Sequence, residues 1–328
     1  MNEATVQAKK DFSRIGLSLF AIGAITTALQ FFLSFLWAVS TSGTSLEEAD
    51  WAMWILTFVP MYLIAMPIGI RMMGKVFVEP FPVHKMEAKR FWTLMLCCMP
   101  IMYGGNIIGT VLSSVLSGGT AQNALMEMVM ENPVPTMITA VLIAPFLEEY
   151  IFRKQIIDRL GKYGEKTAML FSALTFGLFH MNLFQFFYAF GLGLIFAYVY
   201  TRTRLLRYPV IMHMIINFLG SAVAPLLLNV LDMDVLMALE TGEATMEQII
   251  PALPGLLAYL GYSGLLLISV VAGAVLLSLR WNKRILLPAS RELPDGSGFR
   301  VSCRNVGMIL FTLLCLIMIL FSLISGLL

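Results

Sequence analysis

The sequence predicts an all-α polytopic membrane protein with about nine transmembrane helices, or eight if one short segment does not cross. Composition is the first reason: of 328 residues, 59% are hydrophobic and 13% are charged, whereas soluble domains carry about 25% charged residues. Run length is the second. The apolar residues collect into uncharged runs of about 20 residues, which is the length that crosses a bilayer as a helix.

The placement of charge is the third reason. All 22 Lys and Arg fall into five clusters, and the predicted outer loops between them carry acidic residues and no basic ones. Because cytoplasmic loops are enriched in Lys and Arg, the pattern predicts a multi-pass protein of the cell membrane with a cytoplasmic N-terminus and an outer C-terminus. The clusters are Lys9–Arg14, Arg71–Arg90, Arg153–Lys166, Arg202–Arg207 and Arg280–Arg304.

The predicted spans form a single transmembrane domain over residues 1–328. The fifth is short and joins the sixth through Met181-Asn182 alone, so this pair could be a partly inserted hairpin. Residues 230–254 form an acidic outer loop with room for a short surface helix, and 281–304 form a cytoplasmic linker whose Pro and Gly content indicates flexibility. The spans are 15–39, 51–70, 91–114, 134–152, 167–181, 183–201, 208–229, 255–279 and 305–328, and the last one could re-enter the membrane without crossing it.

Five polar residues interrupt the apolar spans. Charged groups inside a span cost a few kcal/mol each, so they are candidates for function. Glu148 and Glu149 lie near the inner end of the fourth span, His180 ends the fifth, and His213 and Asn217 lie in the seventh.

Helical spacing predicts how these side chains are arranged. Glu149 and Arg153 are four residues apart and can pair on one helix face, while Glu148 lies about 100° around the helix and can face another helix. A carboxylate with histidines can deprotonate water, and an amide or imidazole can donate to a developing oxyanion. The set therefore suits peptide hydrolysis, if His180 and Asn217 reach the same pocket.

The depths of the residues agree only if the fourth helix is long. His180 lies 14 residues beyond Lys166, or roughly 21 Å along a helix, which is deeper than Glu148. The mismatch disappears if the fourth helix continues to Leu160 in the cytosol and the chain turns at Gly161 and Gly164.

Each residue also has a structural interpretation. Glu149 and Arg153 alone could be a structural ion pair, and His180 or Asn217 alone could hydrogen-bond neighbouring helices. The two glycines of Gly105-x-x-x-Gly109 could bring helices close, although ordinary packing explains them equally well. The joint occurrence of the polar residues on three helices favours a functional site over structural roles alone.

Three motifs resemble the CAAX-protease and bacteriocin-processing (CPBP) family of intramembrane peptidases. They are EExxxR at Glu148–Arg153, FxxxH at Phe176–His180 and HxxxN at His213–Asn217. The resemblance is good over 134–229, which it identifies as the catalytic core of a CAAX-protease-like helical fold, and it indicates a bacterial member. Bacterial relatives act in peptide maturation, bacteriocin immunity or signalling.

The resemblance implies an endopeptidase that cleaves a peptide bond at the cytoplasmic membrane face. Glu148 would activate water with help from His180, His213 and Asn217 would bind the oxyanion, and Glu149 with Arg153 would brace the site. Phe176 belongs to the same set of site residues. Family members are often called metallopeptidases, although a metal-free glutamate mechanism has also been argued for them.

Alternatives to these interpretations stay open. We expect no required cofactor, because no compact HExxH-type pair is present; the alternative is Zn²⁺ held by Glu148, His180 and His213. The expected partners are a peptide or membrane-associated protein substrate and the lipid bilayer, with no nucleic acid. The alternative functions are a non-catalytic immunity or scaffold protein of the same fold, and an ion-coupled transporter, which the lack of internal repeats disfavours.

Overall fold

Every regular element of the described chain is a helix. The computed structural model describes residues 3–44, 46, 49–123, 129, 133–280 and 286–324, and no strand occurs in those ranges. The first half contains α1 (Glu3–Thr41), α2 (Asp50–Val59), η1 (Pro60–Ala65), α3 (Met66–Met73), α4 (Ala88–Leu116), α6 (Pro133–Met137), η2 (Ile138–Ile143), α7 (Ala144–Glu149), η3 (Tyr150–Gln155), α8 (Ile156–Leu160) and η4 (Gly161–Tyr163).

The second half continues the same pattern. Four short segments of the chain (η1, η2, η3 and η5) are π-helical, and η4 is a 3-10 turn. The elements are α9 (Glu165–Phe179), α10 (Leu183–Thr203), α11 (Arg207–Phe218), η5 (Leu219–Val223), α12 (Ala224–Asn229), α13 (Met233–Thr241), α14 (Met246–Arg280), α15 (Gly298–Cys303) and α16 (Val306–Ile324).

Eight helical segments of the described chain are long and apolar enough to cross a membrane. They coincide with all the predicted spans except the fifth, which is α9 and has only 15 residues. The fold class is therefore confirmed, with eight full-length spans and one short helix. The segments are Glu3–Thr41, Trp54–Met73, Ala88–Leu116, Val134–Tyr163, Leu183–Thr203, Arg207–Asn229, Met246–Arg280 and Val306–Ile324.

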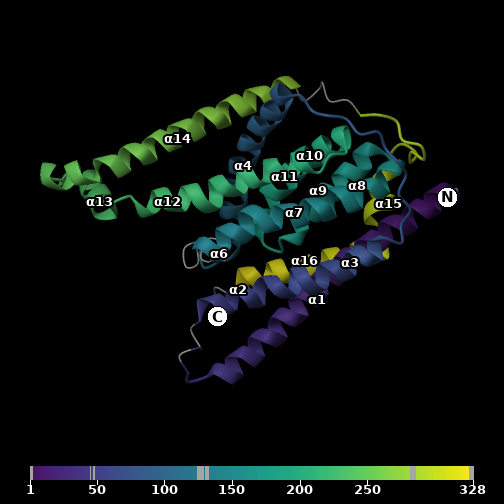
Figure 1. The fold of residues 1–328 in the computed structure, drawn as a ribbon, viewed down its shortest axis with the longest axis horizontal. Helices are drawn as coiled ribbons and strands as arrows, with labels where there is room; N and C mark the ends of the chain where they lie inside the picture. The colour runs from purple at the N-terminus through teal and green to yellow at the C-terminus, as the bar shows by residue number, and fades with distance from the viewer. Residues whose placement is uncertain are drawn as a thin grey trace.

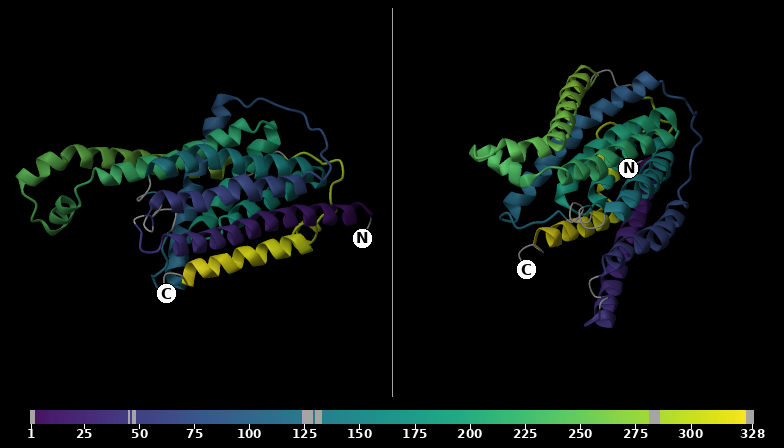
Figure 2. Two further views of the ribbon diagram at one scale, coloured as in Figure 1. Left: turned by 60° about the horizontal axis from the view of Figure 1, so that its bottom comes forward. Right: turned by 60° about the vertical axis from the view of Figure 1, so that its left-hand side comes forward.

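The chain ends lie at opposite ends of the helical bundle (Figures 1 and 2). The loops that carry basic residues meet at the N-terminal end. There the Lys162 ammonium donates to Phe77 O, and Arg291 N donates to Lys162 O. The predicted grouping of basic loops on one side is thus observed, while the side of the membrane that they face stays a prediction.

The fourth span reaches its predicted end. It continues through α8 to Leu160, and the chain reverses at Gly164, whose φ of +124° favours glycine. Because the fourth span extends to Leu160, α9 runs antiparallel to it from this end of the bundle, and His180 at the end of α9 lies at the depth of Glu148.

Close helix approaches set the position of α10. A Cβ on Gly105 would lie 2.6 Å from Tyr188 Cα, and one on Gly109 would lie 2.6 Å from Leu183 O. Because only a hydrogen fits at such distances, these two glycines of α4 let it pack directly on α10. On its other side α10 packs against α9.

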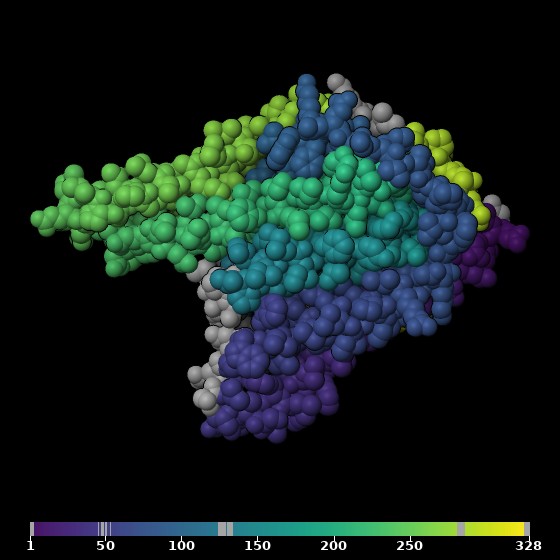
Figure 3. Space-filling view, viewed as in Figure 1, coloured from purple at the N-terminus to yellow at the C-terminus, as the bar shows by residue number. Residues whose placement is uncertain are grey.

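Two regions flank the core of the bundle: helices α12 to α14, and the linker between α14 and α15. The predicted surface helix of the outer loop is α13, whose N-cap Asp232 accepts from the backbone of Asp234 and Val235. Helices α12 to α14 project beyond the rest of the molecule (Figure 3), and Gly273 is the only buried residue described in α14. Lipid is the expected environment of this exposed apolar surface.

The predicted flexible linker is partly docked. Residues 281–285 lie outside the described part, but Arg291 N and Leu293 N donate to Lys162 O and Tyr163 O of the η4 turn. Leu287 N also donates to a carboxylate oxygen of Glu165 at 2.7 Å. These bonds hold the described part of the linker against the turn between α8 and α9.

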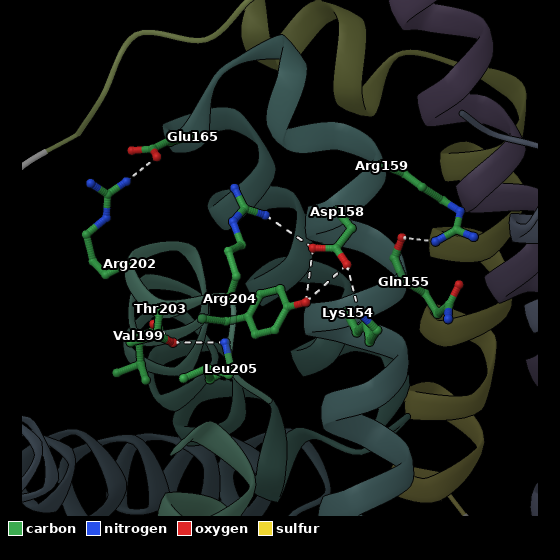
Figure 4. A network of polar contacts seen from close by, with 11 residues as sticks. Lys154, Gln155, Asp158, Arg159, Glu165, Val199, Arg202, Thr203, Arg204 and Leu205 are labelled. Carbon is green, nitrogen blue, oxygen red and sulfur yellow. Dashed lines mark hydrogen bonds and ion pairs between the residues drawn. The ribbon is translucent and has the colours of Figure 1, made fainter. Parts of the chain in front are cut away.

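A polar network stabilises this basic end of the bundle (Figure 4). Asp158 accepts from Tyr200 Oη at 3.0 Å and from Arg204 Nη1 at 3.3 Å, and it also pairs with Lys154. Arg202 pairs with Glu165. The network joins the end of the fourth span to the loop between α10 and α11, and so fixes the helices that carry the polar motifs.

Candidate active site

A buried ion pair forms the base of the candidate site. Arg153 Nε donates to Glu149 Oε2 at 2.7 Å, and Arg153 Nη2 donates to Glu149 Oε1 at 3.2 Å. Both side chains are fully buried. The pairing predicted from their spacing is present, and its two parallel bonds hold the carboxylate in a fixed plane.

The His213 ring approaches this carboxylate from α11. Its Nδ1 lies 3.1 Å from Glu149 Oε1. A carboxylate paired with a guanidinium accepts hydrogen bonds, so we assign the ring hydrogen to Nδ1. The other nitrogen, Nε2, then carries a lone pair when the imidazole is neutral.

Glu148 faces His213 from the other side. Its Oε2 lies 4.0 Å from His213 Nε2. The Glu148 side chain is 13% exposed, whereas that of the adjacent Glu149 is completely buried. Neighbouring glutamates on one helix thus have separate environments, as their angular separation predicts.

His180 is held in a similar way to His213. It follows the last residue of α9, and its Nδ1 lies 2.8 Å from Phe176 O. A backbone carbonyl can only accept, so the hydrogen is again assigned to Nδ1. The lone pair of neutral His180 is therefore on Nε2.

The Phe176 ring packs against several members of the set. Its centroid lies 4.9 Å from that of His180 and 5.8 Å from that of His213, both edge to face. The Arg153 guanidinium carbon lies 4.6 Å from the same centroid. Phe176 thus fixes the mutual orientation of both imidazoles and the cation.

Asn217 is directed toward a neighbouring helix. Its Nδ2 donates to Ala140 O at 2.7 Å. Ala140 lies in the π-helical segment η2, where the regular ladder of backbone bonds is interrupted. The bond ties α11 to the helix before Glu148 and uses one of the two amide hydrogens.

The proposed zinc ligands are not grouped as a metal site. Among the described residues, no three or more His, Cys, Asp or Glu side chains are placed to hold an ion. Glu148, His180 and His213 carry the donor atoms that a Zn²⁺ ion would use. The mechanism below uses no step at a metal.

Ser172 contacts the candidate site but belongs to none of the three motifs. It lies one turn before Phe176 on the same face of α9, and its hydroxyl accepts from Arg153 Nη1 at 2.9 Å. Its spacing of four residues before Phe176 and eight before His180 places it on the same helix face as the FxxxH motif. Serine is common in membrane helices and carries no charge, so this spacing alone does not distinguish Ser172 from an ordinary packing residue.

The sequence of this region matches a known family. Residues 130–219 match the Rce1-like family, described as type II CAAX prenyl endopeptidase Rce1-like. The resemblance to CAAX proteases is confirmed. The matched segment includes all three motifs.

Two bacterial relatives support the same assignment. The membrane-embedded CAAX protease MroQ of Staphylococcus aureus (strain USA300) is 33% identical over 156 residues, which cover 44% of this chain and 62% of the relative. The putative membrane peptidase YdiL of Bacillus subtilis (strain 168) is 32% identical over 98 residues, covering 29% and 38%. No solved structure matches the chain.

The chain spans less than two thirds of the length of each relative. The similarity supports a peptidase role for this multi-pass membrane protein.

Proposed function

We propose that this chain is an intramembrane endopeptidase that hydrolyses a peptide bond at the cytoplasmic membrane face with a water activated by Glu148. The observation that supports it best is the placement of Glu148 Oε2 4.0 Å from His213 Nε2, with Glu149 on the other nitrogen of that ring. A base and a polarising imidazole thus face one another beside a buried carboxylate.

Glu148 is the general base in this proposal. Water can reach Glu148 because its side chain is partly exposed, whereas the neighbouring Glu149 is fully buried. Glu148 takes a proton from water as the oxygen attacks the scissile carbonyl carbon. It then delivers that proton to the leaving nitrogen as the C–N bond breaks, so that one carboxylate serves as base and acid.

The oxyanion requires hydrogen-bond donors. In the proposal His213 takes up a proton from solvent at Nε2 when substrate binds and donates from that nitrogen to the oxyanion, while Nδ1–H keeps its 3.1 Å contact with Glu149. Asn217 keeps a second amide hydrogen beyond its bond to Ala140. His180, with Nε2 as an acceptor, is placed in the proposal to orient the water.

The substrate is a peptide or a membrane-associated protein reached from the cytosol. MroQ is a CAAX protease by its name, and the Rce1-like family is described as prenyl endopeptidases. We propose the same reaction class here, peptide-bond hydrolysis, without assigning a lipidated substrate.

The test compares the membrane peptides of cells that produce the wild type with those of cells that produce Glu148→Gln. We expect at least one protein to be cleaved only in the presence of the wild type, and then cleavage of the same protein by purified enzyme in liposomes. The matched control is Glu87→Gln, which changes an exposed glutamate before α4. Full physiological function with Glu148→Gln would favour the non-catalytic scaffold instead.

A further inference from the structure

The Ser172 hydroxyl lies between two elements of the candidate site. It is fully buried in α9, donates to Phe152 O at 2.6 Å and accepts from Arg153 Nη1 at 2.9 Å. Both partners lie on the helix that carries the two glutamates. Neither partner is a residue of α9, so both hydrogen bonds of the hydroxyl link α9 to the neighbouring helix.

The acceptor of the Ser172 hydrogen bond lies in the π-helical segment η3. Residues Tyr150–Gln155 form a widened turn, which interrupts the regular i→i−4 ladder. The carbonyl of Phe152 lies inside this turn and is buried, where an unpaired carbonyl would be costly. Ser172 supplies the hydrogen that the carbonyl accepts.

The direction of both bonds is fixed by chemistry. A hydroxyl has one hydrogen, and a carbonyl can only accept, so the hydrogen of Ser172 points at Phe152 O. Its lone pairs are then turned toward Arg153, whose guanidinium can only donate. Ser172 therefore presents an acceptor of defined direction to the cation.

Arg153 connects the Ser172 hydroxyl to the His213 imidazole through Glu149. Its guanidinium makes two bonds to Glu149 and one to Ser172, and the plane of a guanidinium is set once three of its hydrogens are bound. Glu149 in turn receives His213 Nδ1 at 3.1 Å. Four residues thus form a continuous chain of hydrogen bonds from α9 to α11.

We propose that Ser172 is a positioning residue of the candidate site, which acts through Arg153 and Glu149 to hold His213 in its Nδ1–H form with Nε2 toward Glu148. The role of the aligned His213 in hydrolysis rests on the proposed function. The alignment itself does not, because it is a property of the resting protein.

Thr175 provides a matched control on the same helix. It is as completely buried as Ser172, but its hydroxyl donates to backbone carbonyls of α9 itself, Phe171 O at 2.8 Å and Ser172 O at 3.2 Å. Thr175→Val removes a buried hydroxyl without touching Arg153. A general effect of losing a buried hydroxyl would appear in both variants.

The experiment measures the ¹⁵N resonances of the His213 ring in purified full-length protein, assigned by comparison with His213→Gln. In Ser172→Ala we expect the Nδ1–H form to lose population to the Nε2–H form, with no change in Thr175→Val. Unchanged His213 resonances in Ser172→Ala would overturn the proposal. So would an equal change in Thr175→Val.

A second pair of variants guards against misfolding. Ser172→Thr and Ser172→Val have the same shape and differ only in the hydroxyl, so the threonine should keep the wild-type resonances and the valine should not. On a cleaved substrate, the valine variant should have a kcat about ten- to a hundredfold below that of the threonine variant, with similar KM. This is the range for one hydrogen bond to a charged group.

Equal kcat and equal resonances in the two variants would contradict the positioning role. If the resonances shift as expected but the wild type cleaves nothing, the proposed function fails and the positioning stands.

Discussion

Glu149 and His213, which are 64 residues apart in the chain and lie on different helices, are joined by a contact of 3.1 Å between Oε1 and Nδ1. The same oxygen accepts from Arg153 at 3.2 Å. One carboxylate therefore serves both as the partner of a buried cation and as the orienting group of an imidazole. Loss of the Glu149 carboxylate would therefore remove a partner from both Arg153 and His213, whereas loss of the Glu148 carboxylate would leave the Glu149–Arg153 pair intact.

Replacing Glu149 by Ala should lower both stability and activity. Arg153 is fully buried, and removing one partner of a buried ion pair costs about 3–5 kcal/mol. The thermal unfolding temperature of the purified variant in detergent measures the loss. The control is Glu79→Ala, which breaks a pair with the half-exposed Arg291 and should cost far less. An unfolding temperature equal to the wild type would contradict a structural role for the pair.

Replacing Glu148 by Gln, or His180 by Ala, should abolish proteolysis and leave the protein inserted and abundant. Glu148 is partly exposed and forms no buried ion pair like that of Glu149 and Arg153, so its loss leaves no buried charge without a partner. General acid–base catalysis contributes roughly 10²- to 10⁴-fold, so Glu148→Gln should lower the rate on an identified substrate by at least about that factor, to the limit of detection. Normal turnover by either variant would remove that residue from the catalytic set.

The orientation in the membrane predicts which introduced cysteines react from outside. In a variant without its four native cysteines, a membrane-impermeant thiol reagent should label cysteines at Thr44 and Thr241 in intact cells, and should label one at Ser290 only after lysis. All three positions are exposed. The expectation follows from the positive-inside rule, which places the five basic clusters on the cytoplasmic side. Labelling at 290 in intact cells would reverse the topology.

Much of the fold could be predicted because the bilayer imposes simple rules. Apolar length located eight full spans, and the depth argument placed the end of the fourth helix at Leu160, where α8 ends. Helical spacing also predicted the Glu149–Arg153 pair, since four residues make about one turn. These features depend on local sequence and on the period of the helix.

The remaining features depend on contacts between helices, which no local pattern encodes. The carbonyl of Phe152 in the π-helical segment η3 accepts a hydrogen bond from Ser172, and this bond can be recognised only when η3 and α9 are packed together. The bond from Asn217 to Ala140 O spans 77 residues of chain. Spacing alone could place Asn217 one turn from His213, but it could not show which acceptor the amide reaches.

Activity is expected to survive complete removal of metal ions. A catalytic zinc normally has three protein ligands at about 2.0–2.2 Å and an open position, and the described residues include no group of three side chains placed in that way. In the proposed mechanism His213 Nε2 and Glu148 Oε2, which lie 4.0 Å apart, act directly on water and substrate. Metal content of the purified active protein is measured by mass spectrometry, and its activity is then assayed after exhaustive chelation.

Stoichiometric zinc, with activity lost on chelation and restored by its readdition, would replace the glutamate mechanism by a metal one. The same side chains would then act as ligands, and Ser172 would still orient His213 through Arg153 and Glu149.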